Sequence, residues 1–264
     1  MSAGRRIRKR RSKPLRLLQF TDMHVTGDDD GRVKDVATHE TFERCLEHAR
    51  SHHYPVDAIL LTGDLVQDDA RGYPRLASML ARESVPVHCL PGNHDLPAEM
   101  ERLLARDPFV LAPVAQHPHW SLVQLDSTVD GSPHGELSGD SLAFLDDTLG
   151  RFGDLHALVV LHHQPVAIGS ALLDAIGLGN GPALFDVLAR HDNVRGVLWG
   201  HVHQAFEGVR DGVALMATPS TCFQFVPGQD FAIDGRPPGY RWLHLHPDGA
   251  INSRVVWLPE DAWR

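Results

Sequence analysis

Short apolar runs alternate with amphipathic segments along the first part of the chain. Leu15–Thr21 is a short, mostly apolar run typical of a buried strand, and Ala37–His52 carries apolar residues at helical spacing on one face. The alternation continues with a predicted strand at Ala58–Leu61, a helix at Pro74–Arg82 and a strand at Pro86–Leu90. Strands that alternate with helices in this way predict an α/β fold.

A second set of alternating segments begins near residue 120. We expect Ser138 to cap a helix there and the Gly-rich stretch 168–182 to form a mobile loop. The other expected elements are strands Trp120–Asp126, Ala157–Leu161 and Val194–Trp199, and helices Asp140–Leu149 and Ala183–His191.

The pattern becomes antiparallel from Phe206 onward. The dipeptides Asp211-Gly212 and Asp248-Gly249 are favoured in tight hairpins, and Ala250–Trp257 is expected to be the terminal strand that closes the sheet. No segment resembles an interdomain linker. At 264 residues, 42% of them hydrophobic, residues 14–264 are expected to form a single domain.

Polar residues able to bind a metal follow five of the predicted strands. In open α/β sheets ligands bind beyond the carboxyl ends of the strands, where the loops converge. A single motif of this kind could be an ordinary turn. Gly92-Asn93, for example, could be a turn followed by a surface His. An ordinary turn does not explain why polar residues of this type follow all five strands. The residues in question are Asp22, His24, Asp64, Asn93, His162, His201 and His203.

These seven residues form a set of oxygen and nitrogen ligands without sulfur. Such a set is typical of a pair of divalent or mixed-valence first-row ions such as Fe, Mn, Zn or Co. Asp64 is the natural bridge, which leaves Asp22, His24 and His203 on one ion and Asn93, His162 and His201 on the other. Two ions about 3.5–4 Å apart hold a hydroxide and clamp a phosphate, so the set predicts phosphoester hydrolysis.

Charge and cysteine content narrow the class of protein. Residues 1–13 contain seven of the 25 Lys and Arg residues, so the remainder has 18 basic against 34 acidic side chains, or about −16. An acidic body argues against nucleic acid as the main partner. The basic segment 1–13 is expected to be a disordered solubilising tail, although contact with RNA or anionic lipid stays open.

No signal peptide or transmembrane stretch is present in the sequence, so we expect a cytoplasmic protein. The cysteines, Cys45, Cys89 and Cys222, are odd in number and far apart, which excludes a cysteine-based zinc site and suits a reducing compartment. We expect them in or near the core.

The five strand-end motifs resemble those of the calcineurin-like metallophosphoesterase superfamily. They are Asp22-x-His24, Gly63-Asp64, Gly92-Asn93-His94-Asp95, His162-x-x-Pro165 and Gly200-His201-x-His203. More narrowly the chain is similar to the class III bacterial 3′,5′-cyclic AMP phosphodiesterases, through the stretches 62–67, 133–138, 200–204 and 217–225. The basic tail is the one departure from that family's pattern.

This resemblance implies a four-layer α/β/β/α sandwich, a dinuclear centre containing Fe or Mn, and hydrolysis of cyclic AMP to 5′-AMP. A small cyclic nucleotide is then the partner, while metal identity, oligomeric state and selectivity among cyclic nucleotides stay open. The resemblance carries the metal roles onto the seven ligands and contact with the nucleotide phosphate onto His24, Asp64, Asn93, His94 and His203.

His94 is the candidate for assisting the leaving 3′-oxygen, as a general acid or as a hydrogen-bond donor. Asp95 is expected either to orient His94 or to cap the following helix. His163 follows a ligand on an extended segment and should face away from the metals, either to support a ligand by a hydrogen bond or simply to pack.

Four other functions are alternatives to a cyclic AMP phosphodiesterase. A serine/threonine phosphatase of the superfamily has an Asp where Gln67 stands, and a nuclease requires a basic groove. A phosphodiesterase acting on 2′,3′-cyclic nucleotides or glycerophosphodiesters stays open, because the metal ligands do not recognise the base or the sugar. A non-catalytic scaffold is disfavoured because all seven ligands are present.

Overall fold

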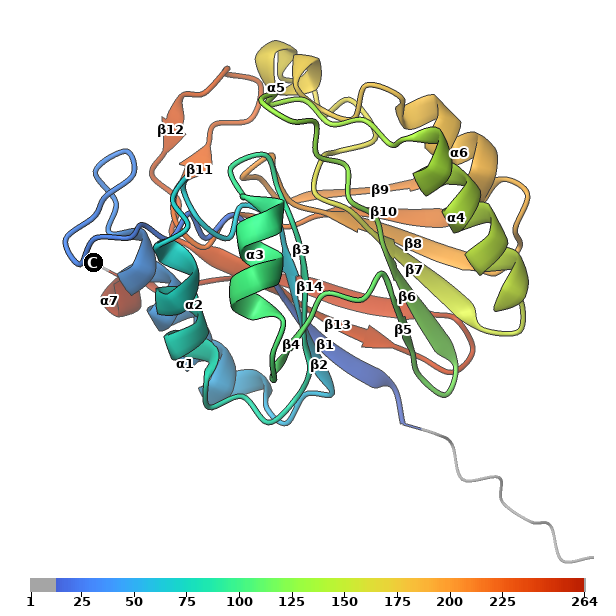
Figure 1. Ribbon diagram of the computed structural model, residues 1–264, viewed down its shortest axis with the longest axis horizontal. Coiled ribbons are helices and arrows are strands. Elements are labelled where there is room, and N and C mark those ends of the chain that lie inside the picture. The colour runs from blue at the N-terminus through green and yellow to red at the C-terminus, as the bar shows by residue number, and fades with distance from the viewer. Residues whose placement is uncertain (1–12, 264) are drawn as a thin grey trace, which may run out of the picture.

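The computed structural model describes residues 13–263, so the predicted basic tail, except for Lys13, lies outside the described residues. Two six-stranded sheets pack face to face, with helices on both outer faces (Figure 1). This is the expected four-layer α/β/β/α sandwich. No helix among residues 13–263 is long and apolar enough to cross a membrane.

The first sheet contains the strands of the N-terminal half and the last two long strands. Its order is β14-β13-β1-β2-β3-β4, in which β1 to β4 run parallel and β13 and β14 pair antiparallel. The strands are β1 Leu15–Phe20, β2 Ala58–Thr62, β3 Val87–Leu90, β4 Phe109–Val110, β13 Gly239–Leu245 and β14 Ile251–Trp257.

The second sheet has the order β5-β6-β7-β8-β10-β9. Its strands are β5 Val114–Gln116, β6 Trp120–Gln124, β7 His156–Val160, β8 Val194–Trp199, β9 Phe206–Arg210 and β10 Val213–Ala217. A hairpin at Asp211-Gly212 joins β9 and β10, as predicted, but β10 also runs parallel to β8. The expectation of an antiparallel pattern from Phe206 onward is therefore wrong for this pair of strands. A small separate pair, β11 Gln224–Phe225 and β12 Ile233–Asp234, lies outside both large sheets.

Each outer face of the sandwich carries its own helices. Helices α1 Thr38–His53, α2 Gly72–Leu80 and α3 Pro97–Leu104 lie on the side of the first sheet, and α4 Gly139–Arg151 and α6 Gly181–Leu188 on the side of the second (Figure 1). Helix α5, Ala171–Ala175, packs instead against Phe223 and Phe225 through Leu173. Short α7, Glu260–Trp263, ends the described chain. The Ser138 side chain accepts a hydrogen bond from the Ser141 N–H and caps α4, as predicted. Helix α7 was not predicted, whereas α3 is the helix expected after Asp95. Helix α5 with the start of α6 replaces the loop expected at 168–182.

Three apolar cores hold the layers together. One lies between the first sheet and α1–α3 and another between the second sheet and α4 and α6. The third joins the two sheets, with Leu17 and Leu60 from one packing with Leu158 and Leu198 from the other. Burial of these side chains fixes both sheets, so the loops that follow the strands start from rigid positions.

Candidate metal centre

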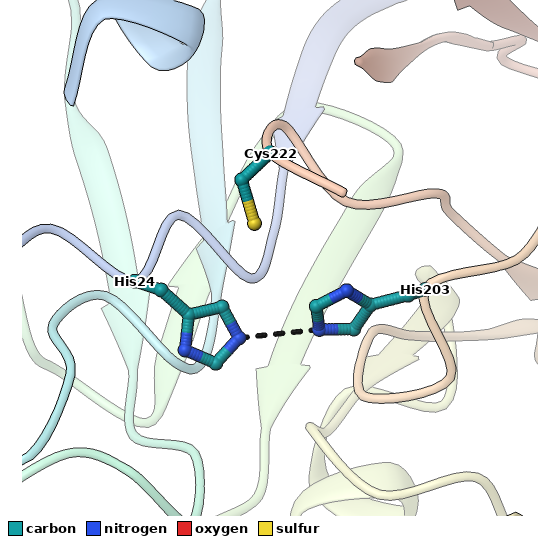
Figure 2. Close-up of side chains that lie close together, drawn as sticks. All are labelled: His24, His203 and Cys222. Atoms are coloured by element: carbon teal, nitrogen blue, oxygen red, sulfur yellow. Dashed lines mark hydrogen bonds between the residues drawn. The ribbon is translucent and has the colours of Figure 1, made fainter. Parts of the chain in front are cut away.

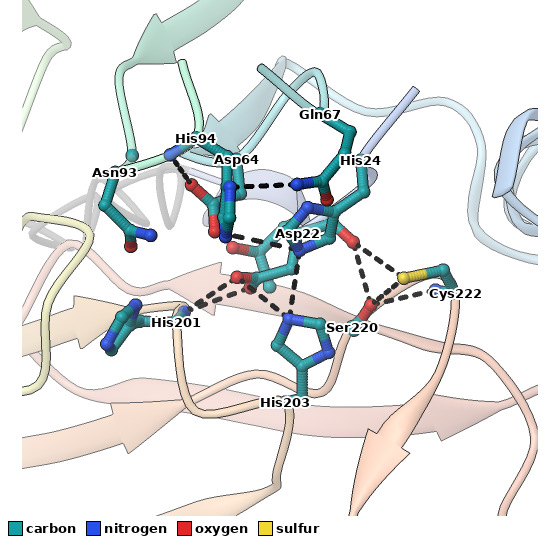
Figure 3. A network of polar contacts seen from close by, with 12 residues as sticks. Asp22, His24, Asp64, Gln67, Asn93, His94, His201, His203, Ser220 and Cys222 are labelled. Atoms are coloured by element: carbon teal, nitrogen blue, oxygen red, sulfur yellow. Dashed lines mark hydrogen bonds and ion pairs between the residues drawn. The ribbon is translucent and has the colours of Figure 1, made fainter. Parts of the chain in front are cut away.

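The seven predicted ligands come together at the carboxyl ends of the strands, and all of them except His162 are labelled in Figure 3. Asp22 and His24 follow β1, Asp64 follows β2 and Asn93 follows β3 in the first sheet. The second sheet supplies the remaining three ligands, His162 after β7 and both His201 and His203 after β8. The centre therefore lies where the two sheets meet, and each sheet contributes to it.

The backbone at Asp22 and His24 does not continue the extended form of β1. Asp22 and His24 have φ angles of 53° and 47°, in the left-handed region, because the chain leaves β1 and runs beside the loop after β2. The Asp22 N–H donates to the Gly63 carbonyl at 3.0 Å and the His24 N–H to that of Asp64 at 2.9 Å. The side chains of Asp22 and His24 both point to the metal centre. They do so because of the left-handed backbone, and not because side chains alternate between the two faces of an extended strand.

Two glycines make room for the centre. Gly63 has a φ of +91°, which glycine adopts freely in a tight turn. At Gly92 a Cβ atom would lie 2.2 Å from Oδ1 of Asp64, so any side chain there would displace this carboxylate.

One group of ligands gathers around His24. Its Nε2 lies 3.1 Å from Nε2 of His203 and 3.7 Å from Oδ2 of Asp64. Nε2 of His203 lies 3.4 Å from Oδ1 of Asp22. Bonds of about 2.1 Å to a shared ion place neighbouring ligand atoms about 3.0–3.4 Å apart, so most of these spacings fit one ion.

A second group gathers around His162. Its Nε2 lies 3.4 Å from Oδ2 of Asp64, 3.2 Å from Oδ1 of Asn93 and 3.2 Å from Nδ1 of His201. Oδ2 of Asp64 is thus the atom common to both groups, which fits a bridging carboxylate. The chemistry of this donor set suits two ions.

Backbone carbonyls hold three of the imidazoles by their other nitrogen. Nδ1 of His162 donates to Thr62 O at 2.9 Å, and Nδ1 of His203 to Phe223 O at 2.8 Å. Nε2 of His201 donates to Ile176 O at 3.1 Å, from the segment just after α5. Such bonds fix the tautomer and aim the free nitrogen at the centre.

Burial and charge set the protonation of the ligands. Burial lowers the pKa of His24 to about 4 and that of His201 to about 3, so both rings are neutral at pH 7 and present lone pairs. Burial opposes the charge on Asp64, but the adjacent His162 outweighs it and holds the pKa of Asp64 well below its usual range. The same contact raises the pKa of His162 to about 9 against its burial. A metal ion that binds here displaces the His162 proton.

Asp95 does not orient His94 and does not cap α3 through its side chain. Its buried carboxylate accepts hydrogen bonds from the backbone N–H groups of Leu65, Val66 and Gly92, at 3.0, 3.3 and 2.9 Å, and from the Tyr73 hydroxyl at 3.0 Å. The N-cap of α3 has no side-chain hydrogen bond. Burial, together with the charge on Asp64, raises the pKa of Asp95 to about 7. Asp95 therefore ties the loop after β2 to the loop after β3.

His94 lies at the edge of the centre, with one nitrogen within 4.8 Å of ligand atoms of His24 and Asp64. The backbone N–H of His94 donates a hydrogen bond to Oδ1 of Asp64 at 2.9 Å. Nδ1 of its ring lies 2.9 Å from the Gln67 amide nitrogen and 3.0 Å from the Asp68 carboxylate (Figure 3). Asp68 thus takes the place expected of Asp95.

His163 packs against the second group of ligands and does not turn fully away as expected, since one of its nitrogens lies within 4.8 Å of ligand atoms of His162 and His201. Its ring centroid lies 4.6 Å from that of His201, and its Nδ1 lies 2.8 Å from Oγ of Ser127. Nε2 of His163 is buried and has no hydrogen-bond partner among the described residues. Burial, followed by the nearby His201, lowers the pKa of His163 well below its usual range.

Sequence reasoning missed one neighbour of the centre, the thiol of Cys222. The three cysteines are buried and free, as predicted. Cys222, however, places its Sγ within 4.8 Å of ligand atoms of His24 and His203 (Figure 2). Burial raises its pKa to about 12, and Sγ donates to Asp22 O at 3.3 Å, so the group is a neutral thiol. Cys222 is far along the chain from His24 and lies outside the motif that contains His203, so no local sequence pattern predicted this contact.

Known proteins share both the sequence and the fold. Residues 15–205 match the calcineurin-like phosphoesterase family. The 3′,5′-cyclic adenosine monophosphate phosphodiesterase CpdA of Haemophilus influenzae is 40% identical over 244 residues, which cover 91% of this chain and 89% of the relative. CpdA of Escherichia coli strain K12 is 38% identical over 253 residues, covering 95% of this chain and 92% of the relative.

A dimetal phosphatase from Danio rerio superposes with a TM-score of 0.66 at 15% identity, covering 94% of this chain and all of that structure, and so shares the fold. The strand-end motifs, the four layers and the two-part ligand group agree with the family match over most of the chain. This protein belongs to the calcineurin-like phosphoesterase family.

Proposed function

We propose that this protein is a dinuclear-metal phosphodiesterase that hydrolyses 3′,5′-cyclic AMP to 5′-AMP and thereby lowers cellular cyclic AMP. The observation that carries the proposal is the position of Oδ2 of Asp64, 3.7 Å from Nε2 of His24 and 3.4 Å from Nε2 of His162, between two groups of ligands. Identity of 38–40% with cyclic AMP phosphodiesterases over nine-tenths of the chain supports the choice of substrate.

We assign Asp22, His24 and His203 to one ion, and Asn93, His162 and His201 to the other, with Asp64 shared. Iron or manganese suits this set of nitrogen and oxygen ligands. When bound, two such ions supply positive charge for the phosphate oxygens and a nucleophilic water at neutral pH.

Five side chains are positioned to contact the phosphate of the substrate. Four are ligands that also line the cavity above the centre, and the fifth, His94, lines the same cavity without belonging to the assigned ligands. The five are His24, Asp64, Asn93, His94 and His203.

His94 assists the leaving 3′-oxygen in this proposal. Its Nδ1 faces Asp68 and Gln67, so only Nε2 remains to face a substrate oxygen. With Nδ1–H donated to Asp68, Nε2 also carries a hydrogen in the imidazolium form of the ring. As the bond from phosphorus to the 3′-oxygen breaks, this Nε2–H either transfers its proton to that oxygen or donates a hydrogen bond to the phosphorane. Asp95 acts indirectly, by holding the two loops that carry Asp64 and Asn93.

The test is an assay of metal-reconstituted protein with cyclic AMP, cyclic GMP, 2′,3′-cyclic AMP and bis(p-nitrophenyl) phosphate, with products separated by chromatography. We expect cyclic AMP to yield 5′-AMP and not 3′-AMP. Faster turnover of 2′,3′-cyclic AMP than of cyclic AMP would establish the broader phosphodiesterase instead. Asp64→Asn is the control that should abolish turnover of every substrate.

A further inference from the structure

An aromatic wall, formed by Phe223, Phe225 and Phe231, borders the metal centre on one side. The ring of Phe223 lies 4.7 Å from that of His203, and the ring of Phe225 lies 4.9 Å from the same histidine. Phe231 packs edge-on against Phe225, with centroids 5.4 Å apart. The wall therefore begins at a metal ligand and runs outward from it.

The wall and the ligands line a single cavity of about 390 Å³. Leu173 and Ile176, from α5 and the segment after it, line the same cavity. Phe223 and Phe225 pack with Leu173 in an apolar cluster that is separate from the three cores of the sandwich. One cavity thus combines a polar end suited to a phosphate with an apolar, aromatic side.

Phe231 is an unusual residue for its position. It lies in the turn between β11 and β12, its backbone has a φ of 52°, and its side chain is 40% exposed. Glycine adopts this left-handed conformation freely, whereas a bulky residue is strained there, and such strain gathers at binding sites. Neither backbone geometry nor core packing explains a phenylalanine at this turn.

The neighbouring Asp230 fixes this turn against α5. Its carboxylate accepts hydrogen bonds from Oγ of Ser170 at 2.8 Å and from the N–H of Leu172 at 2.9 Å. These two contacts hold the turn beside the segment that supplies Leu173 and Ile176 to the cavity. The position of the Phe231 ring is therefore set before any ligand binds.

We propose that the aromatic wall, with Phe231 as its outer ring, binds the purine base of the nucleotide. The inference rests on the proposed function, because it takes the occupant of the cavity to be a nucleotide. A cyclic nucleotide joins an anionic phosphodiester to a flat base with a polarisable face. Once the ligands hold the phosphate, the wall is the apolar surface of this cavity that continues from them, and bases stack on such rings.

The larger face of a purine overlaps an aromatic ring more fully than that of a pyrimidine does. The wall therefore selects purine over pyrimidine nucleotides. It does not distinguish adenine from guanine, because a ring face provides no hydrogen bonds to the base edges.

The experiment measures inhibition of bis(p-nitrophenyl) phosphate turnover by 5′-AMP and by ribose 5-phosphate, which differ only by the base. The wild-type protein should bind 5′-AMP about tenfold more tightly than ribose 5-phosphate, the scale of one stacked base. Phe231→Gly should bring this ratio close to one and leave metal content and melting temperature unchanged, because glycine suits the backbone there. Phe231→Tyr, which keeps the ring, should preserve the ratio.

Ile233→Ala is the matched control. Ile233 lies two residues further along the same turn and strand pair and is 48% exposed, but it does not line the cavity. It should leave the ratio of the two inhibition constants unchanged. An unchanged ratio in Phe231→Gly, or an equal fall in Ile233→Ala, would overturn the assignment of the wall.

This experiment does not depend on cyclic AMP turnover. If the wild-type protein fails to cleave cyclic AMP while Phe231→Gly still loses its preference for 5′-AMP, the wall stands and the proposed reaction falls. If cyclic AMP is cleaved but the preference for 5′-AMP survives in Phe231→Gly, the reaction stands and the wall falls.

Discussion

The carboxylate of Asp68 lies 3.0 Å from Nδ1 of His94, across the loops that follow β2 and β3. A hydrogen bond from Nδ1 to Asp68 orients the imidazole ring. Nε2 is then the only ring nitrogen that can contact a substrate. Asp68 is 63% exposed at its side chain, so its contribution is to orientation more than to charge.

His94→Ala should keep both ions and near-normal stability while kcat for cyclic AMP falls by about 10²–10⁴-fold, the usual scale for a positioned acid. The loss should be smaller for bis(p-nitrophenyl) phosphate, because p-nitrophenolate leaves without protonation. Steady-state kinetics with elemental analysis measures both. Asp68→Asn should lose less activity than His94→Ala. Equal losses of His94→Ala on both substrates would assign His94 the hydrogen-bond role, and loss of metal would make it a ligand.

Asp64→Ala should remove both ions together, because Oδ2 of Asp64 lies within 3.7 Å of ligand atoms in both groups. Elemental analysis should find close to two ions per chain in the wild-type protein and close to none in the variant. Since the ions bind only the folded state, their loss should also lower the melting temperature. A variant that retains one ion would show that Asp64 does not bridge.

Asp95→Ala should destabilise the protein by about 3 kcal/mol, because three buried N–H groups lose their acceptor. Urea unfolding measures the change. Tyr73→Phe is the matched variant, since it removes a single donor to the same carboxylate, and it should cost about 1 kcal/mol. Similar losses in the two variants would mean that the link between the two loops contributes little.

The strand ends show what could be predicted from the sequence. All seven predicted ligands gather at the strand ends, because a residue that directly follows a buried strand inherits its position from the sheet. The partner of His94 could not be predicted in this way. Asp95 is adjacent in sequence but points into the β2 loop, whereas Asp68 reaches His94 through a fold of that loop. Adjacency along the chain does not fix the direction of a side chain once the backbone leaves the strand.

The aromatic wall was missed for a related reason. Phe225 and Phe231 come from a strand pair outside both large sheets. This pair is held beside the centre by contacts between distant segments, from the Phe225 N–H to the His203 carbonyl and from Ser170 to Asp230. The parallel pairing of β10 with β8 was also missed. The dipeptide Asp211-Gly212 indicates the hairpin that joins β9 to β10, but it does not indicate which strand pairs with the other edge of β10. Contacts between segments far apart in sequence leave no local pattern.

Stability should depend on pH through His88, at the second position of β3. Burial, reinforced by nearby His117, lowers the pKa of His88 from 6.5 to about 4. The unfolded chain therefore binds a proton between these pH values that the folded chain excludes, so the stabilisation is complete above pH 6.5 and is lost as the pH falls toward 4. The loss amounts to about 3 kcal/mol.

His88→Leu tests this linkage when urea unfolding is followed from pH 7 to pH 4. Its free energy of unfolding should fall less steeply with decreasing pH than that of the wild-type protein. If the free energies of unfolding of the two proteins fall in parallel with decreasing pH, the pKa of His88 is the same in the folded and the unfolded chain.

Five of the seven ligands, Asp22, His24, Asp64, His201 and His203, have left-handed backbones with φ between 47° and 66°. Side chains other than glycine, asparagine and aspartate are strained there by about 1 kcal/mol each, so the strain falls on the three histidines. For protein engineering this means that the apo protein should become more heat-resistant when glycine or asparagine replaces these histidines. A stability screen without metal would therefore select inactive variants, and directed evolution of this scaffold should be carried out with the ions present.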